Sequence, residues 1–529
     1  MSKIKIEAGN RYNENGLAWE LLYFRLAAGT IKQVEKGGHL YCLTMGRIQK
    51  KGWVTMQEAK EKVSVQKALL MVGVALLVII IGKLFLKLDT TLVLFISSTA
   101  VSIIAVLFCG TSWNKIEEQI SIGIRQMGVP VIILMEIGML VGAWMISGTI
   151  PTIMYYGMKI MNPRFFLVLT CITCSVMSVA SGTSWGTLST LGVALMGVAL
   201  GLGIPLPYVA GAIVVGSFFG DKMSPLSDST IVAAASCNVE LTEHIRHMLY
   251  TTVPGYIVSL VLYLILGMQF GGGTIQNEEY TVILDTLQAN FVINPIMVIP
   301  PIIVLILILM KKPCLPTFAA GIASAIVLAI VCQGTDLSSA MAAVVSGYKQ
   351  ETGTALVDGL LNRGGISSML STVGLVLAAG VFGAPIKATG AVEVIFSKVK
   401  SFAKTPRQLM ILCTIMHPVF ILIAVTYYVT YPVMGEMVGP IYEEYGLHKK
   451  NLTRTFEDTG TISAPLIPWG MSGAFITTTL GITPGEYWMY MPLTWMCALT
   501  GIVLAITGIG VARTDGTMIT PLFRKKAKK

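Results

Sequence analysis

Long apolar runs recur along almost the whole of this 529-residue chain, and they constrain its fold more than any other feature. Each is close to the ~20 apolar residues that a helix needs to cross a bilayer. Only 12% of the residues are charged, whereas soluble proteins carry about a quarter. Because the runs are continuous rather than alternating every second residue, they predict membrane-spanning helices and not a β-barrel. Most enzyme classes are excluded, since little chain is left for a soluble domain.

Thirteen apolar runs follow the first 66 residues or so. They lie at 68–86, 90–109, 129–149, 165–181, 187–203, 207–220, 248–268, 291–310, 316–333, 366–386, 408–430, 460–480 and 488–511. Several are short or are broken by glycine and proline. We therefore expect an all-α polytopic membrane protein with roughly 10–13 transmembrane helices or re-entrant segments.

Polar segments divide the chain into five predicted parts. They are a polar N-terminal extension at 1–66, a first membrane half at 67–268, an extracellular loop at 269–290, a second membrane half at 291–511 and a basic cytoplasmic tail at 512–529. The extension is expected to be cytoplasmic, or to contain a misassigned start upstream of Met56.

Charge asymmetry sets the expected orientation in the cytoplasmic membrane. The segment 269–290 holds acids and no Lys or Arg, whereas 398–407 holds four basic residues and no acid. The first is predicted outside and the second inside, with both termini in the cytoplasm. An even number of crossings follows, so at least one of the thirteen runs is re-entrant. The net charge of +10 lies mainly near the ends of the runs, which argues against nucleic acid as a partner.

Two pairs of segments suggest an internal duplication, a common feature of secondary transporters. Residues 131–150 resemble 371–392, and the broken polar stretch 178–192 resembles 423–435. The sequence therefore predicts two related halves with broken helices. The nine cysteines follow no zinc or disulfide spacing, and no cofactor is predicted.

The stretch SGTSWGT at 181–187 places hydroxyls and irregular backbone within apolar surroundings. Such backbone is tolerated at membrane depth only where it is buried in protein or lines a cavity. Its hydroxyls and carbonyls are neutral oxygens suited to Na⁺. The predicted lining hydroxyls here are Ser181, Thr183, Ser184 and Thr187. The alternative is close helix packing by small residues, which we expect for Gly138 with Gly142 and for Gly216 with Gly220.

Acids among the apolar runs indicate function more strongly, because each costs about 2.5–3.5 kcal/mol at membrane depth. The predicted ion- and proton-binding acids are Glu136, Asp221, Asp228, Glu457 and Asp458. Further lining hydroxyls are expected at Ser227, Ser229, Thr459, Thr461 and Ser463. A carboxylate in this setting can bind either a proton or Na⁺, and that competition is the chemistry an exchanger requires.

Pro225 separates Asp221 from Asp228 and predicts two half-helices that meet at a Na⁺ site formed by these two acids. Lys222 is a candidate counter-charge for one acid. In the alternative interpretations, Asp221 and Lys222 form a structural pair, and Asp228 caps the helix that follows it.

Three other functions remain as alternatives. An organic-acid exchanger would hold a carboxylate with hydroxyls and helix N-termini, but no arginine is expected at membrane depth near these motifs, and Lys387 is the one cation that could serve. A channel would need a ring of like groups, usually from several subunits. A hydrolase is suggested by Gly182–Gly186, Asp228 and His244, but its nucleophile turn requires a strand in a soluble domain.

Four motifs make residues 66 to 511 similar to the NhaC-type sodium/proton antiporter family: LVGAWMISGTIPTIMYYG, ASGTSWGTLSTLG, FFGDKMSPLSDST and EDTGTISAPLIPWG. The resemblance implies a bacterial cytoplasmic-membrane exchanger of Na⁺ for H⁺ that works by alternating access. Some relatives couple these ions to malate uptake and lactate release. The implied partners are Na⁺, H⁺ and the bilayer; a homodimer is left open.

Overall fold

The computed structural model describes residues 63–270, 278–310, 312–352, 358, 361–362, 364–515 and 517, and these form helices joined by short connections. The described part contains no β-strand, and its one isolated bridge joins Leu447 to Arg513. The prediction of an all-α polytopic membrane protein is confirmed. Most of the predicted N-terminal extension and most of the basic tail lie outside the described residues.

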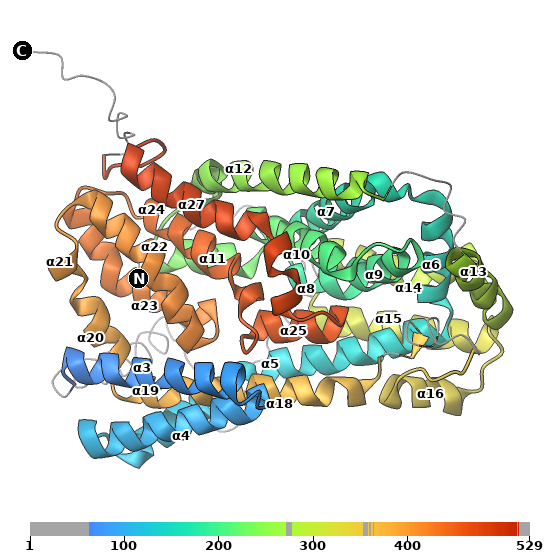
Figure 1. Cartoon of the computed structure of the whole chain (residues 1–529), viewed down its shortest axis with the longest axis horizontal. Helices are drawn as coiled ribbons and strands as arrows, with labels where there is room; N and C mark the ends of the chain where they lie inside the picture. Colours follow the sequence, from blue (N-terminus) through green and yellow to red (C-terminus); the bar gives the residue numbers. More distant parts are fainter. Residues whose placement is uncertain are drawn as a thin grey trace, which may run out of the picture. The chain divides into compact units, whose positions relative to one another are not determined.

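Nine described helices are long and apolar enough to cross a membrane, or up to eleven if two bent helix pairs each count as one span. The bent pairs turn by 91° between 290 and 295 and by 59° between 490 and 492. The principal helices, seen in Figure 1, are α3 (Val65–Ile80), α4 (Thr90–Cys109), α5 (Trp113–Ile146), α6 (Thr149–Ile160), α7 (Pro163–Ser181), α8 (Ser184–Thr187), α9 (Val193–Gly201), α10 (Leu206–Met223), α11 (Asp228–Ser236), α12 (Leu241–Met268), α13 (Glu278–Asn290), α14 (Ile299–Leu309), α15 (Cys314–Val331), α16 (Leu337–Ser346), α18 (Ile366–Phe382), α19 (Ala384–Ala388), α20 (Ala391–Ser397), α22 (Pro406–Ala424), α23 (Tyr427–Glu444), α24 (Lys450–Phe456), α25 (Met471–Leu480), α26 (Pro484–Tyr487) and α27 (Pro492–Thr507). Two π-helical segments continue these helices, η2 (Leu188–Gly192) and η4 (Glu457–Thr461).

Helix α7 ends in a break whose backbone is set by one glycine. Gly182 adopts a left-handed conformation with φ 71°, which glycine tolerates at little cost. The next residue, Thr183, is extended and accepts a hydrogen bond from the Gly186 backbone N–H at 3.2 Å, so it caps α8. A new helix therefore starts directly after the break.

A second break has the same backbone pattern. Val425 ends α22 with φ 67°, and Thr426 is extended and caps α23 by accepting from the Tyr428 backbone N–H at 3.3 Å. A β-branched residue is rarely found in this region, so the conformation must be stabilised by its surroundings. Both breaks fall in the pair of segments, 178–192 and 423–435, whose similarity suggested a duplication.

Small residues let the helices approach closely, as the sequence predicted for its two glycine pairs. A methyl group built on Gly216 of α10 would lie 2.4 Å from the Cys171 carbonyl oxygen of α7. One built on Gly138 of α5 would lie 2.5 Å from the Gly365 carbonyl oxygen, next to α18. Figure 1 shows α5 running beside α18.

The buried apolar side chains form two large clusters. One draws mainly on α5 to α10, α14, α15 and α25, and the other on α3, α4, α18 to α20 and α22 to α24. The first break belongs to the first cluster and the second break to the second. The predicted loop at 269–290 is partly helical, since α13 occupies its C-terminal half.

Candidate ion-binding site

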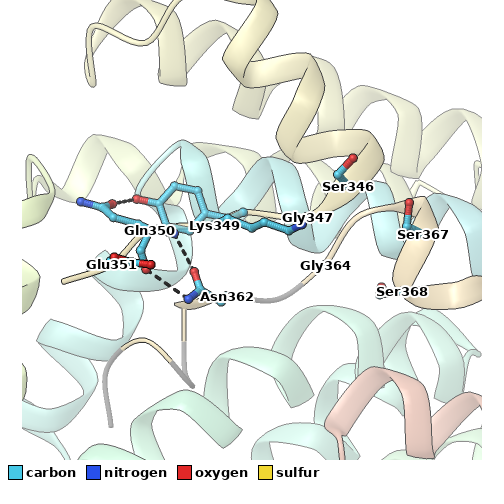
Figure 2. A pocket seen from close by; sticks show the side chains of 10 residues that line it. Ser346, Gly347, Lys349, Gln350, Glu351, Asn362, Gly364, Ser367 and Ser368 are labelled. Carbon is cyan, nitrogen blue, oxygen red and sulfur yellow. Dashed lines mark hydrogen bonds between the residues drawn. The ribbon is translucent and has the colours of Figure 1, made fainter. Parts of the chain in front are cut away.

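Two hollows are prominent among the described residues, and the larger contains none of the predicted site residues. It has a volume of about 730 Å³ and lies where α16 ends and α18 begins (Figure 2). Its lining includes Gln350 and Asn362, which are hydrogen-bonded to each other through side chain and backbone at 2.7 and 3.1 Å. Neither helix break contributes to its lining.

The second hollow, about 410 Å³, lies between the two helix breaks, and we call it the inter-break cavity. The breaks contribute residues 183–186 from one side and 426–429 from the other. The remaining lining residues are Gln126, Met127, Val129, Pro130, Ile133, Asp221, Asp228, Cys314, Phe318 and Met471. Segments from both halves of the sequence therefore meet at two of the predicted acids.

Asp221 is the deeper acid of the inter-break cavity. It lies in the last turn of α10, and only 2% of its surface is exposed. Its Oδ2 accepts a hydrogen bond from the Ser184 hydroxyl at 2.7 Å, and its Oδ1 accepts from the Ser227 hydroxyl at 2.5 Å. Neutral hydroxyls orient this carboxylate, but no cationic side chain among the described residues forms an ion pair with it. It is therefore placed to receive a proton or a metal cation.

Asp228 is the outer acid of the same cavity, and it is exposed. It is the first residue of α11, and the Tyr428 hydroxyl from the second break donates to its Oδ2. The helix cap is Ser227, whose hydroxyl accepts from the Ser229 backbone N–H at 3.2 Å, so the N-cap interpretation of Asp228 is wrong by one residue. As predicted, the chain breaks around Pro225.

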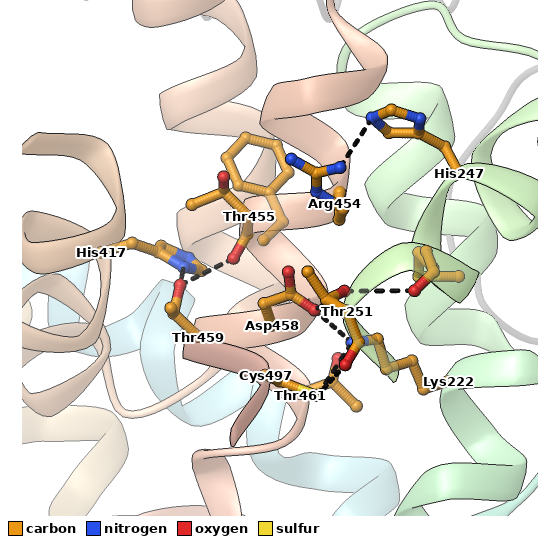
Figure 3. Close-up of polar contacts among 12 residues, drawn as sticks. Lys222, His247, Thr251, His417, Arg454, Thr455, Asp458, Thr459, Thr461 and Cys497 are labelled. Carbon is orange, nitrogen blue, oxygen red and sulfur yellow. Dashed lines mark hydrogen bonds and ion pairs between the residues drawn. The ribbon is translucent and has the colours of Figure 1, made fainter. Parts of the chain in front are cut away.

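Lys222 pairs with Asp458 and not with its sequence neighbour Asp221. Its ammonium donates to Asp458 Oδ1, and both side chains are buried (Figure 3). The same oxygen accepts from the Thr251 hydroxyl of α12 at 2.7 Å. The ion pair thus joins the end of α10 to η4, and the predicted alternative of an Asp221–Lys222 pair is wrong.

Glu457 is buried without an ion pair among the described residues. Its exposed fraction is 0%, and neither carboxylate oxygen makes a hydrogen bond of good geometry among the described residues, although Thr461 lies close by. Asp221 and Lys222 are near enough to interact with it electrostatically. An ionised carboxylate left unpaired in such a place is strongly unfavourable, so a proton or a cation must neutralise it.

The other predicted hydroxyls bind within the protein. Thr459 lies 2.8 Å from His417 Nδ1, and Thr461 lies 2.7 Å from the Tyr431 hydroxyl. Thr187 donates to the Thr183 carbonyl at 3.0 Å. Ser181, Ser229 and Ser463 also form local hydrogen bonds. Of the nine predicted hydroxyls, only two, Thr183 and Ser184, line the inter-break cavity.

Two predicted charged residues lie outside the inter-break cavity lining. Glu136 is half-buried on α5, one turn beyond the lining residue Ile133, and one of its carboxylate oxygens has no partner among the described residues. Lys387 is on α19, where its main electrostatic partner is Glu393. Among the described residues, neither Glu136 nor Lys387 forms a hydrogen bond or an ion pair with Asp221.

Arg454 is a buried cation that the sequence reading missed. Only 1% of its surface is exposed, and its Nη1 donates to the Gly510 carbonyl at 2.8 Å and lies 3.1 Å from His247 Nε2 (Figure 3). The expectation that no arginine lies near these motifs is wrong. Helix α24 has a polar sequence that suggests a loop, but all seven of its residues are buried. Arg454 does not line the inter-break cavity.

Discontinuous helices that bring a buried carboxylate to a cavity within an apolar helical bundle define a class of membrane transporter. The chain belongs to the Na⁺/H⁺ antiporter family, whose model matches residues 54–239 and 216–509. The similarity to the NhaC-type family inferred from the motifs is thereby confirmed, and membership of this family makes the chain an antiporter.

Relatives named for different transport activities resemble the chain along most of their length. It is 33% identical to the malate-2H⁺/Na⁺-lactate antiporter of Bacillus subtilis over 83% of this chain and 94% of the relative. It is 33% identical to the Na⁺/H⁺ antiporter NhaC of Alkalihalophilus pseudofirmus over 86% of this chain and 98% of the relative. It is 31% identical to the arginine/ornithine antiporter ArcD of Halobacterium salinarum over 85% and 93%.

Proposed function

We propose that this protein exchanges Na⁺ for H⁺ by alternating access, with the two ions competing for the carboxylate of Asp221. The observation that supports this most directly is the setting of that side chain. It is buried at a helix break, held by two neutral hydroxyls and placed on a cavity that both halves of the chain form.

The proposed Na⁺ ligands are oxygens from both sides of the α10–α11 break. Asp221 and Asp228 supply carboxylates, and Ser184 and Ser227 supply hydroxyls that already point at Asp221. Hard oxygen ligands of this kind replace the water around an alkali cation. When Na⁺ leaves, a proton on Asp221 would remove the cost of a buried charge, so the site is loaded by one ion or the other.

We propose that Glu457 is one of the groups that bind the exchanged proton. It is fully buried, has no hydrogen bond of good geometry among the described residues and lies within electrostatic range of Asp221. A protonated Glu457 is therefore compatible with Na⁺ on Asp221, whereas an ionised one would attract the cation away from it.

Asp458 has a different proposed role from the other acids. Because Lys222 already neutralises it, a proton or Na⁺ gains little by binding there. We propose that the Lys222–Asp458 pair fixes the position of η4 relative to α10. Glu136 lies off the inter-break cavity and is proposed as an accessory proton-binding group.

The cellular arrangement follows the sequence expectations and stays a proposal. The chain would lie in the cytoplasmic membrane of a bacterium, with both termini inside and the two halves moving around the inter-break cavity. The two helix breaks that face each other across this cavity are the feature that alternating access would use.

An organic acid is a less suitable substrate for this cavity. One relative is named as a malate/lactate antiporter, but no Lys, Arg or His of the described residues lines the inter-break cavity of this chain. Two acids do line it, and they would repel a carboxylate.

The proposal can be tested with purified protein in liposomes that contain a pH-sensitive dye. Liposomes loaded with Na⁺ and diluted into Na⁺-free buffer should become acidic inside, because Na⁺ leaves as H⁺ enters. A trace identical to that of protein-free liposomes would contradict the proposal. Acidification that requires malate or lactate in the medium would support the organic-acid alternative instead.

A further inference from the structure

The volume of the inter-break cavity exceeds what Na⁺ and its ligands need. At about 410 Å³, it falls within the ~300–1,000 Å³ of ordinary small-molecule pockets. A water molecule occupies ~30 Å³ in the liquid, so a sodium ion with its oxygen ligands would leave most of this space unused. The cavity is large enough for an organic solute.

Much of the cavity wall is aromatic, beside the oxygens proposed to bind Na⁺. Trp185 lines it while stacking on Phe475 at a centroid distance of 4.4 Å, and Tyr427 and Tyr428 line it with their rings 4.5 Å apart. Phe318 adds a fourth ring. Aromatic faces contribute nothing to the oxygen shell of Na⁺, but they attract alkylammonium groups through cation–π interactions.

The charge of the lining selects for a cation. Asp221 and Asp228 are its only charged side chains among the described residues. The nearest buried cation, Lys222, is 0% exposed and is held by Asp458, so it cannot offset them. An ammonium group offers three donors, which suits two carboxylates flanked by hydroxyls better than any anion does.

We propose that the inter-break cavity binds an organic solute through an ammonium group, with the nitrogen at Asp221 and Asp228 and the alkyl part against Trp185 and Tyr428. This inference rests on the proposed function, since it uses the same two acids. The ammonium group competes there with Na⁺ and H⁺, and the solute moves in exchange for them.

Cys314 provides a direct probe because it lines the cavity and is partly accessible. We would use a Cys42→Ser, Cys332→Ser background, which removes the only other described cysteine that is not buried and the one at position 42, and measure the rate at which a maleimide modifies Cys314. The probes are Na⁺, 1,4-diaminobutane, ornithine and butyrate. The diamine carries only ammonium groups, whereas ornithine also carries a carboxylate, so the two distinguish a polyamine-like from an amino-acid-like solute.

The expected result is that millimolar diamine or ornithine slows modification at least fivefold, whereas butyrate has no effect. Asp228→Asn should weaken that protection about tenfold, a loss of ~1.4 kcal/mol in ammonium binding. Trp185→Leu should weaken it as well, and Trp185→Phe, which keeps a ring, should retain it. Radiolabelled solute should enter Na⁺-loaded proteoliposomes faster than protein-free ones.

Each other outcome overturns the inference, and two of them spare the proposed function. Protection by Na⁺ but by neither amine would mean that the cavity serves an inorganic cation alone. Protection by butyrate would show that the cavity accepts an anion, contrary to the proposed preference for a cation. Absence of protection by any probe, together with no Na⁺-driven pH change in the same liposomes, would remove the proposed function too.

Discussion

Asp221 and Asp458 are both buried acids at interrupted helices, but the structure neutralises them in different ways. Asp221 accepts from the hydroxyls of Ser184 and Ser227, pairs with no cationic side chain among the described residues and lines a cavity. Asp458 receives the Lys222 ammonium and does not line that cavity. The first therefore needs a mobile cation or a proton, whereas the second carries its counter-charge permanently. We therefore propose an exchange role for Asp221 and a structural role for Asp458, although the sequence placed both among the predicted ion- and proton-binding acids.

The largest effect is expected from Lys222→Met. It leaves Asp458 buried without its cation, and breaking such a pair typically destabilises a protein by about 3–5 kcal/mol. The apparent melting temperature in detergent should fall sharply. Adding Asp458→Leu to the variant should bring the melting temperature most of the way back to that of the wild type. Lys115→Met, on the exposed start of α5, is the matched control. An unchanged melting temperature would show that the ion pair is not structural.

Asp221→Asn should leave stability almost unchanged and stop exchange. The amide oxygen still accepts from one serine hydroxyl and the amide nitrogen can donate to the other, but the amide cannot carry a proton or balance Na⁺. The rate of Na⁺-driven acidification should therefore fall at least about 100-fold, or ~2.7 kcal/mol. Asp285→Asn, on the exposed face of α13, is the control substitution. Full exchange by Asp221→Asn would remove this acid from the mechanism.

Ser184→Ala should give a smaller, purely functional effect. Removing one donor to a charged group costs about 1.5–3 kcal/mol, so the Na⁺ concentration for half-maximal exchange should rise roughly tenfold or more. Ser189→Ala removes a buried hydroxyl whose one hydrogen bond among the described residues is to the Gly186 carbonyl, so it should not shift that concentration. Equal shifts in both variants would mean that Ser184 acts through the helix and not through Asp221.

Thr251→Val should have the smallest effect. Asp458 Oδ1 keeps Lys222 as a donor, so no buried oxygen is left unpaired, and the loss of stability should be about 1 kcal/mol. The neighbouring Thr252 hydroxyl is buried without a partner among the described residues, so Thr252→Val should be neutral or stabilising. A large loss in Thr251→Val would mean that Lys222 alone does not stabilise Asp458.

The sequence was informative where a residue is costly in its local setting. Acids, prolines and glycines within apolar runs marked the break at Pro225 and the break at Gly182. Ionisable groups and irregular backbone are unfavourable at membrane depth unless they are buried in protein or line a cavity. The second break was found only through its similarity to the first, since Val425 gives no local signal for a left-handed residue.

The choice of partners was not predictable, because it depends on which segments pack together. Lys222 is next to Asp221 in the chain but pairs with Asp458, 236 residues away. Arg454 was missed because a polar helix buried among other helices resembles a loop in sequence. Glu136 met the same criteria as Asp221, but its helix does not bring it to the cavity lining.

Proton release on Na⁺ binding is the most direct test of the idea that one buried carboxyl serves both ions. Purified protein in weakly buffered detergent solution would be mixed with Na⁺ while a dye reports pH and radioactive sodium reports binding. The account predicts that bound Na⁺ releases protons from the wild type and that Asp221→Asn neither binds Na⁺ nor releases them. Sodium binding to the wild type without any release of protons would contradict it.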